Sequence, residues 1–293
     1  MSKNNRNTIC IEDAGVLQQT AFAGDQYVLR LAAPRCASRA QPGSFIHVRC
    51  ADDLPMRRPL SIMRVNADKG WIEVLYKIVG QGLNRLAGAA KGEIINLLGP
   101  IGNGFRPDSG RPTALLIGGG VGIPPLIFLA EHIHAGRWKD ARPVAFFGSE
   151  IPFPFELVDS DVALTNVPAA TNRAIALLDT KGIPSRLATT GGFAGCYAGF
   201  VTELAGEWLA ALSSAQLEKI ALYACGPEPM LAAVAGLARR FDLPSQLCLE
   251  EFMACGVGGC AGCAVEVQAG GETAMKRVCV DGPVFEGAAV YPG

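Results

Sequence analysis

The sequence predicts a multidomain α+β protein: an N-terminal antiparallel β-barrel, a central α/β domain with a parallel sheet, and a small C-terminal module. Apolar residues alternate with period two as far as about residue 105. Beyond that point the order becomes strand, glycine turn, helix. Near the C-terminus four cysteines gather within residues 255–279. We therefore place the domains at 1–105, 106–244 and 245–293.

The bulk composition excludes several classes of protein. Hydrophobic residues make up 49% of the 293 residues, enough for a sizeable core. The 26 basic and 27 acidic residues nearly balance, which gives no electrostatic case for nucleic acid or an anionic membrane. The first residues lack the apolar segment of a secretory signal. Thr113–Ala130 is uncharged, but GGGVGIPP at its centre would interrupt a spanning helix. We expect a cytoplasmic protein with no nucleic-acid or membrane partner.

The N-terminal part shows the pattern of a compact β unit. The segments YVLRLAA, SFIHVRC and WIEVLYKIV alternate or run apolar, and clusters of Pro, Gly, Asp and Asn separate them. Only Asn84–Ala90 looks helical. Short strands divided by turns are typical of an antiparallel barrel.

The first candidate binding motif is Arg57-Arg58-Pro59-Leu60-Ser61, at the end of a loop that opens a strand. An arginine can clamp a pyrophosphate with two hydrogen bonds, and the serine hydroxyl beside it can reach a flavin ring nitrogen. Taken alone, the motif is also compatible with a solvated basic loop.

Two further segments lie one strand later. Leu75-Tyr76-Lys77 offers apolar and aromatic side chains that can flank a ring. Gly80-Gln81-Gly82 offers backbone N–H groups that can approach a phosphate. An ordinary β-turn is the competing interpretation. The glycines of 98–105, LGPIGNGF, indicate a tight corner between the two units.

The middle of the chain alternates strands with helices. TALLIGG leads through GVGIPP to the helix LIFLAEHIHAG, and the strand PVAFFG follows. Later, SRLATT, a helix, KIALYACG and another helix continue the alternation, which predicts a mainly parallel sheet with helices on both faces. Residues 151–172 fit neither rhythm and are expected to form a long connection.

The glycine turn of this domain has the context of a dinucleotide site, because it follows a strand and precedes a helix. Its glycines are too crowded for G-x-G-x-x-G, so we interpret it as the pyrophosphate turn of another α/β family, with a purely structural turn as the alternative. They are Gly118, Gly119, Gly120 and Gly122.

A second candidate segment ends a later strand, where open α/β sheets bind ligands. It comprises Cys225, Gly226, Pro227, Glu228, Pro229 and Met230. Cys225 is a candidate neighbour of a nicotinamide, and a buried structural thiol is the alternative. Glu150 follows the strand AFFG, where a carboxylate can accept from a ribose 2′-OH and repel a 2′-phosphate. It predicts a preference for NAD over NADP, unless it is a solvated loop residue.

Cys255, Cys260, Cys263 and Cys279 carry the strongest signal. Their spacing, C-x4-C-x2-C followed by a fourth cysteine, is the plant-type arrangement for a [2Fe–2S] cluster. The small residues between them let the backbone wrap tightly and point N–H groups at the sulfurs. From 264 to 278 the sequence alternates around Gly270-Gly271, which predicts a hairpin that returns the fourth ligand to the others.

Three alternatives compete with the cluster. A zinc site usually takes its ligands from two short pairs, and only one such pair is present. A disulfide framework needs an oxidising compartment, and the other six cysteines are scattered. Structural cysteines do not require five small residues among four thiols.

The order of the motifs, RPLS, GQG, GGGVGIPPL, CGPEPML and then the cysteines, resembles the ferredoxin–NADP reductase superfamily. Within it the chain is most similar to the electron-transfer subunits of the NAD-dependent, class 1B dihydroorotate dehydrogenases. The resemblance covers essentially the whole chain. It implies FAD on the barrel, NAD on the α/β domain and the cluster at the C-terminal end.

The resemblance also implies roles for the motif residues. Those that would contact FAD are Arg58, Pro59, Leu60, Ser61, Leu75, Tyr76, Lys77, Gly82 and Leu83. Leu83 stands where the family commonly has threonine, so one hydroxyl donor to the phosphate is missing. NAD would contact the four glycines, Glu150 and the segment from Cys225 to Met230. Ser61 beside the flavin and Cys225 beside the nicotinamide are the candidate catalytic residues.

The parts suggest electron transfer without substrate chemistry of their own. None of the three histidines, His47, His132 and His134, lies in a motif as a base. We expect an oxidoreductase subunit for pyrimidine biosynthesis that serves an FMN-containing dihydroorotate dehydrogenase catalytic subunit, in a heterotetramer. Docking is expected through the cluster loop and the GPVF segment. The alternatives are a reductase subunit of a hydrogenase or sulfite reductase, and a non-catalytic iron–sulfur redox sensor.

Overall fold

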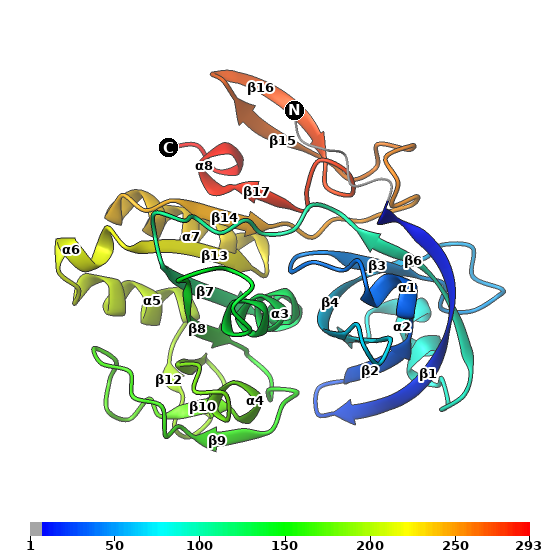
Figure 1. The fold of residues 1–293 in the computed structure, drawn as a ribbon, viewed down its shortest axis with the longest axis horizontal. Coiled ribbons are helices and arrows are strands. Elements are labelled where there is room, and N and C mark those ends of the chain that lie inside the picture. The colour runs from blue at the N-terminus through cyan, green and yellow to red at the C-terminus, as the bar shows by residue number, and fades with distance from the viewer. Residues whose placement is uncertain (1–7) are drawn as a thin grey trace. The chain divides into compact units, whose positions relative to one another are not determined.

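The computed structural model describes residues 8–293, which form two compact units (Figure 1). The first unit contains the chain through Gly104 together with Leu249–Val284. The second contains Phe105–Cys248 and Phe285–Gly293. The change of rhythm near residue 105 therefore coincides with the boundary between the units. The C-terminal segment packs partly in the first unit and partly in the second. The third module predicted for 245–293 therefore rests on the cluster expected there and not on a compact unit of its own.

The first unit is a closed antiparallel barrel, as predicted, with the strand order β1-β2-β5-β4-β3-β6. Its strands are β1 (Cys10–Phe22), β2 (Gln26–Ala32), β3 (Phe45–Val48), β4 (Arg58–Asn66), β5 (Trp71–Lys77) and β6 (Ile94–Ile101). Closure leaves no unpaired sheet edge. The inward side chains form the core, and Leu29, Leu31, Ile46, Ile62, Ile72 and Leu97 have no exposed surface.

Two short helices interrupt the barrel, α1 (Pro34–Ala37) and α2 (Gly80–Ala87). The predicted helix over Asn84–Ala90 therefore begins four residues too late, and Gly80-Gln81-Gly82 is the first turn of α2 instead of a β-turn. Gly80 adopts φ +70°, which lets the chain turn sharply from β5 into the helix.

The second unit is built on a seven-stranded sheet with the order β12-β11-β8-β7-β13-β14-β17. Its strands are β7 (Thr113–Gly119), β8 (Arg142–Gly148), β11 (Ser185–Thr189), β12 (Tyr197–Ala198), β13 (Ile220–Cys225), β14 (Ser245–Cys248) and β17 (Val284–Glu286). The pairs from β12 through β14 are all parallel, as predicted. The helical elements are η2 (Gly120–Gly122), α3 (Ile123–His134), α4 (Ala176–Asp179), α5 (Val201–Ala210), α6 (Ser214–Leu217), α7 (Glu228–Phe241) and α8 (Gly287–Val290).

The strand order of this sheet changes direction at one place. From β7 the chain moves outward through β8 and β11, and it then returns to add β13 and β14 on the other side of β7. Such a switch point opens a crevice at the carboxyl ends of the two central strands. The glycine segment and the cysteine segment predicted to bind a nucleotide begin there, in the last residues of β7 and β13.

The connection 151–172 is held by side chains of the second unit. It contributes β9 (Leu157–Asp159), which pairs with β10 (Arg173–Ile175). Arg186, only 6% exposed, donates to Ser160 Oγ and to the Val162 carbonyl, each at 3.0 Å. Trp208 Nε1 donates to the Thr165 carbonyl at 3.1 Å. A buried guanidinium and an indole therefore hold a segment that lacks a helix or strand rhythm in sequence.

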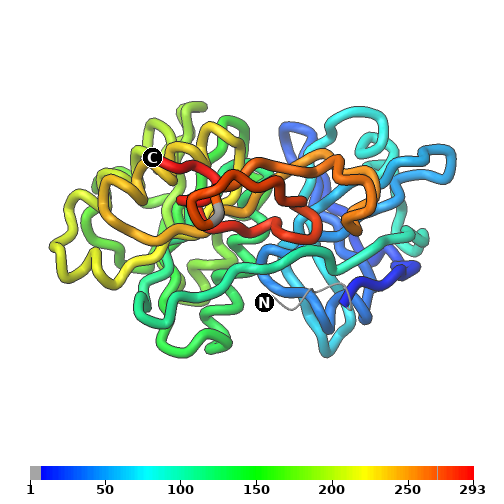
Figure 2. The backbone as a smooth tube through the Cα atoms, turned by 90° about the horizontal axis from the view of Figure 1, so that it is seen from above, coloured from blue at the N-terminus to red at the C-terminus, as the bar shows by residue number. Residues whose placement is uncertain are grey.

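The C-terminal part of the first unit carries the cysteine loop and a hairpin, and Figure 2 shows it as the orange stretch of the tube that precedes the red C-terminal end. The hairpin joins β15 (Ala264–Ala269) to β16 (Glu272–Arg277) through Gly270 and Gly271, whose φ values are +64° and +87°. This confirms the predicted turn, because two successive positive φ angles are those of a type I′ hairpin.

Asn103 ties this segment to the end of the barrel. Its backbone N–H donates to the Gly282 carbonyl at 2.6 Å, and its side-chain amide donates to the carbonyls of Val280 and Asp281 at 3.1 Å. A Cβ on Gly102 would lie 2.3 Å from Pro283 Cδ, so only glycine permits this approach. The barrel therefore provides the support that the short hairpin lacks by itself.

Within residues 8–293, the structure contains no helix that is long and apolar enough to span a membrane. The uncharged stretch Thr113–Ala130 is divided between β7, η2 and α3. The glycines at its centre separate a buried strand from a buried helix, as the sequence predicts.

Candidate functional site

The predicted flavin segments come together on the barrel. The N-terminal end of β4 carries Arg58–Ser61, and the C-terminal end of β5 carries Leu75–Lys77. These ends are neighbours because β4 and β5 are antiparallel, with Ile62 opposite Val74. The helix α2 starts three residues after β5, so its N-terminal N–H groups lie at the same end of the barrel.

Arg58 lies against the first turn of α2. A Cβ built on Gly82 would stand 3.1 Å from Arg58 Nε and 3.3 Å from its Cζ. The guanidinium also donates to the carbonyls of Met56 at 2.9 Å and Arg57 at 3.1 Å. A planar cation beside a helix N-terminus is a suitable site for a phosphate or pyrophosphate.

Arg57 plays a different part from its neighbour. Its Nη1 donates to the carbonyls of His47 at 3.2 Å and Asn96 at 3.0 Å, and its Nη2 donates to Asn96 Oδ1. The side chain thus links the strand β4 to β3 and β6. These hydrogen bonds hold the Arg57 side chain within the barrel, whereas Arg58 lies where it can bind a ligand.

The remaining flavin-motif residues differ in exposure. Tyr76 is 1% exposed, stacks on Tyr27 with ring centroids 5.5 Å apart, and donates its hydroxyl to Gln19 Oε1 at 2.9 Å. Its ring and its hydroxyl therefore make their contacts within the barrel. Leu60 and Leu75 are buried as well. The residues left partly or fully exposed are Pro59, Ser61, Lys77 and Leu83.

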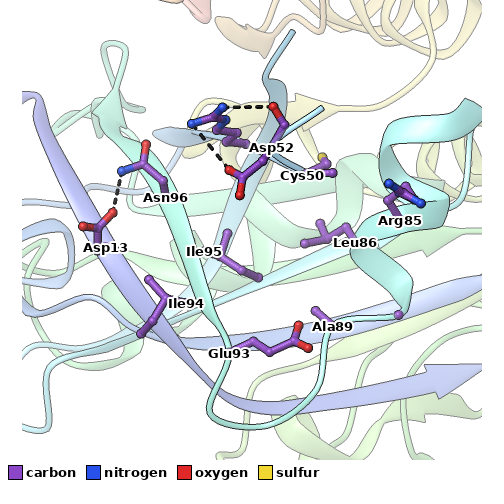
Figure 3. Close-up of a pocket in the computed structure, with 13 residues that line it drawn as sticks. Asp13, Cys50, Asp52, Arg85, Leu86, Ala89, Glu93, Ile94, Ile95 and Asn96 are labelled. Carbon is purple, nitrogen blue, oxygen red and sulfur yellow. Dashed lines mark hydrogen bonds and ion pairs between the residues drawn. The ribbon is translucent and has the colours of Figure 1, made fainter. Parts of the chain in front are cut away.

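A cavity of about 620 Å³ opens elsewhere on the barrel, beside the C-terminal end of α2 (Figure 3). Charged side chains line it, but they have partners: Asp13 accepts from Asn96 at 2.6 Å, and Arg49 pairs with Asp52 at 3.6 Å. None of Arg58–Ser61 lines this cavity. It is therefore distinct from the place where the flavin motifs meet.

In the second unit, the glycine turn and the Cys225 segment meet at the switch point. Cys225 lies opposite Gly118 in the pairing of β13 with β7. A Cβ on Gly122 would stand 2.4 Å from the backbone of Cys225, and one on Gly119 would stand 2.6 Å from Met230 Sδ. Gly122 therefore touches the backbone of the second segment, and Gly119 touches the Met230 side chain, so neither position has room for a Cβ.

The other predicted nucleotide residues surround this junction. Gly120 adopts φ +54° and starts η2, and Gly226 is buried between β13 and α7. Pro227 is the N-cap of α7 and Glu228 its first residue, and both are exposed. Cys225 has no exposed surface, which fits a structural thiol as well as a nicotinamide neighbour.

Glu150 occupies the loop that follows β8, the strand next to β7. Ser149 Oγ donates to the Ile151 carbonyl at 2.7 Å, which bends the chain and leaves the Glu150 side chain exposed. An exposed acid in the loop after this strand is compatible with the predicted contact to the ribose of a dinucleotide.

The four cysteines form two pairs in the first unit. The Sγ atoms of Cys263 and Cys279 are 3.3 Å apart and buried. Cys255 and Cys260 are hydrogen-bonded to each other through their side chains. Among residues 8–293, no three His, Cys, Asp or Glu side chains stand in the arrangement that a single metal ion requires. Two pairs of thiols suit a [2Fe–2S] cluster, in which each of two irons takes two thiolates.

The loop favours ionised sulfur at Cys255. Burial raises the pKa of this thiol, but backbone N–H groups of Val257, Cys260 and Gly259 outweigh burial and lower the pKa to about 6. Burial and the adjacent Cys263 thiol raise the pKa of Cys279 to about 12. Iron binds cysteine as the thiolate, so assembly of a cluster would release the protons that these adjacent thiols hold. The residues therefore fit the cluster predicted from their spacing.

The cluster loop also presents exposed apolar side chains. Cys260 is exposed, and on the same loop Phe252 is 94% and Val257 42% exposed. Gly282 and Pro283 are buried. The first half of the GPVF segment is thus buried. The exposed face near the cysteines consists of the cluster loop, together with Phe252, which sequence reasoning did not single out.

Comparison with known proteins places this arrangement in a family. Residues 250–291 match the model of the iron–sulfur cluster binding domain of dihydroorotate dehydrogenase B. The chain is 36% identical over 281 residues to the dihydroorotate dehydrogenase B (NAD(+)) electron transfer subunit of Bacillus caldolyticus, covering 94% of this chain and 96% of that protein. The chain belongs to this family of electron transfer subunits.

Other members and solved structures agree with the assignment. The electron transfer subunit of Shouchella clausii (strain KSM-K16) is 33% identical over 277 residues, covering 92% of this chain and 94% of that protein. The structure of the NADH-dependent reduced ferredoxin-NADP oxidoreductase superposes with TM-score 0.74 at 24% identity, covering 95% of this chain and 90% of that one. The ferredoxin reductase in carbazole 1,9a-dioxygenase gives TM-score 0.58 at 23% identity over 80% of this chain and 65% of that one. The fold of the electron transfer subunit is therefore that of the ferredoxin reductases.

Proposed function

We propose that the chain carries electrons between NAD and a dihydroorotate-oxidising partner subunit, through FAD on the barrel and a [2Fe–2S] cluster on the C-terminal loop. The observation that carries this proposal is the two pairs of cysteines, packed on the same unit as the Arg58–Gly82 contact. Family membership supports it, because the relatives are named as electron transfer subunits of an NAD-dependent dihydroorotate dehydrogenase.

The three groups would supply complementary chemistry: NAD exchanges a hydride, the cluster one electron at a time, and a flavin either. The chain's own residues bind and orient them. Arg58 and the N-terminal N–H groups of α2 neutralise the charge of a pyrophosphate. Ser61 offers a hydroxyl next to this clamp. Gly118–Gly122 and the segment after Cys225 let a dinucleotide approach the backbone.

The partner is proposed to dock on the exposed face of the cluster loop, defined by Phe252, Val257 and Cys260. An exposed ligand allows electrons to leave to another protein, and an exposed aromatic side chain is the kind that anchors interfaces. We propose that the partner contains FMN, that the complex is a heterotetramer and that it works in the cytoplasm, where cluster thiolates stay reduced.

Reconstitution with the partner tests the function. We expect the purified chain to reduce artificial acceptors with NADH but not to oxidise dihydroorotate by itself. Addition of an FMN-containing dihydroorotate-oxidising subunit should produce NADH from dihydroorotate and NAD+. The chain should co-purify with that subunit as one complex, measurable by light scattering.

Two results would contradict the proposal. One is the oxidation of dihydroorotate by the chain without its partner. The other is coupled NAD+ reduction at full rate by a complex in which Cys260→Ser has removed the cluster, because electrons would then bypass it. A complex of this variant that still oxidises NADH with artificial acceptors is the control for an intact flavin site.

A further inference from the structure

His47 lies inside the first unit, on the short strand β3. It faces Pro59 of β4 and Leu98 of β6 in the strand register. The ring has no exposed surface, and within residues 8–293 neither of its nitrogens makes a hydrogen bond of good geometry, although the backbones of Met253 and Arg57 lie near enough to favour a proton on the ring. A buried polar group without a partner costs free energy, so a native structure that keeps one needs a reason for it.

Two segments with different predicted tasks border the imidazole. Burial and the charge of Arg57 lower the pKa of His47 to about 4, and backbone groups of Met253 and Arg57 act in the opposite direction. Met253 is buried and lies two residues before Cys255, and Arg57 precedes the flavin motif. The neutral ring thus sits between the start of β4 and the start of the cluster loop.

Gly256 lies close to the edge of the ring. This glycine follows Cys255 directly and adopts φ +68°. A Cβ built on it would stand 2.9 Å from His47 Nδ1 and 3.3 Å from Ile101 Cδ1. The first turn of the cluster loop therefore rests on the imidazole edge, and no side chain separates the two.

We propose that His47 is a positioning residue for the iron–sulfur loop: the edge of its imidazole packs on the backbone of Gly256 and holds this loop close to the start of β4. A neutral imidazole has one donor and one acceptor nitrogen, which suits backbone groups on two sides. Hydrogen bonding around ligand sulfurs and their exposure set the potential of such a cluster. The inference rests on the proposed function only in that the loop must hold the cluster.

The alternative is that His47 merely fills space between the strands. His47→Phe keeps a buried planar ring and removes both nitrogens. If the ring only fills space, this variant retains the cluster properties of the wild type. If the polar edge of the ring at Nδ1 supports the loop, the reduction potential of the cluster shifts, its electron paramagnetic resonance signature changes, and iron release to a chelator accelerates about tenfold, which corresponds to a contact worth about 1.4 kcal/mol.

Gly256→Ala tests the same contact by changing the loop instead of the histidine. The new methyl group would push the loop off the imidazole and should reproduce the changed potential and the faster iron release. Because both variants break one contact, the double variant His47→Phe/Gly256→Ala should be no worse than the more affected single variant. The matched control is Gly270→Ala in the hairpin turn, because Gly270 has nearly the same positive φ as Gly256 but an added Cβ there meets nothing within 4 Å. His132→Phe controls for the loss of a histidine elsewhere.

The outcomes are separable. A wild-type chain that binds no iron and sulfide overturns the proposed function and this inference with it. A wild-type chain with a full cluster, and His47→Phe and Gly256→Ala variants with unchanged potential and iron release, overturns the inference alone. Fully additive effects in the double variant also overturn it. Should His47→Phe not fold, His47→Asn takes its place in the same cycle.

Discussion

The guanidinium of Arg58 rests on the backbone of Gly82, so closely that a Cβ at this glycine would lie 3.1 Å from Arg58 Nε. The contact joins two motifs 24 residues apart in sequence, one at the start of β4 and the other in the first turn of α2. It positions a cation and helix N–H groups toward the same place, where a pyrophosphate would be bound.

Gly82→Ala should weaken FAD retention, because the added methyl group displaces the arginine. Alanine is a better helix former than glycine by about 1 kcal/mol, so the thermal stability of the flavin-free protein should not fall. Flavin content after gel filtration and the unfolding temperature of the apoprotein measure the two effects. Gly88→Ala, at the exposed end of the same helix, is the control and should keep its flavin. Full flavin content in the Gly82→Ala variant would show that Arg58 is not part of the flavin site.

Arg58→Ala should mainly weaken FAD binding, whereas Arg57→Ala should mainly lower the stability of the barrel. Loss of Arg58 removes a charge-assisted pair with the pyrophosphate, worth about 1.5–3 kcal/mol of FAD binding. Loss of Arg57 removes hydrogen bonds to His47 and Asn96 and should lower the free energy of unfolding by about 1–3 kcal/mol, with a smaller effect on FAD. Flavin titration and denaturant unfolding of both variants provide the comparison. Equal flavin affinities would show that the clamp is misassigned.

Glu150 should make the chain prefer NAD to NADP. Its exposed carboxylate after β8 is placed to accept from a ribose 2′-OH and to repel a 2′-phosphate. Glu150→Gln should narrow the ratio of kcat/KM for NADH over NADPH by about tenfold, as expected when one charged contact worth about 1.4 kcal/mol is lost. Glu156→Gln, an exposed acid of the same connection, is the matched control. A wild-type chain with the lower KM for NADPH would refute the assignment.

Cys260→Ser should abolish the cluster and leave FAD in place, because the flavin motifs lie on β4, β5 and α2. The wild-type protein should contain about two irons and two acid-labile sulfides per chain. Iron, sulfide and flavin assays on the same preparation are sufficient. Cys196→Ser is the control, since this half-buried thiol belongs to the second unit. Stoichiometric zinc without sulfide would disprove the cluster.

Phe252→Ala should weaken binding of the partner subunit. The side chain is 94% exposed next to the cysteine loop, and large exposed aromatic residues often dominate interface energies. We expect affinity to fall by at least tenfold, or about 1.4 kcal/mol, with unchanged iron and flavin content. Met275→Ala on β16, at a side chain 64% exposed, is the matched control. Unchanged affinity in titration calorimetry would place the docking face elsewhere.

Several features of this protein follow from local sequence alone. The spacing of Cys255, Cys260 and Cys263 determines a tight loop, because small residues permit positive φ angles at Gly256 and Gly258. Gly270 and Gly271 determine the hairpin turn for the same reason. Alternation of apolar residues with period two predicts the barrel, and the later succession of strands and helices predicts the parallel sheet. Both patterns show which side of each element is buried.

Other features depend on contacts between distant parts of the chain. Arg57 and Arg58 are identical neighbours in sequence. The motif position favours Arg58 for FAD, but the contacts with Asn96 and Gly82 give the physical reason for their different roles. The local sequence of Gly80–Gly82 is also compatible with a β-turn, but in the structure these residues form the first turn of α2 at the end of the barrel. His47 sits in an ordinary apolar strand, and nothing in SFIHVRC indicates that Gly256, more than 200 residues later, packs on its ring. Such pairings are decided by tertiary packing, because they are set by the closure of the barrel and by the return of the C-terminal segment to it, which no local pattern encodes.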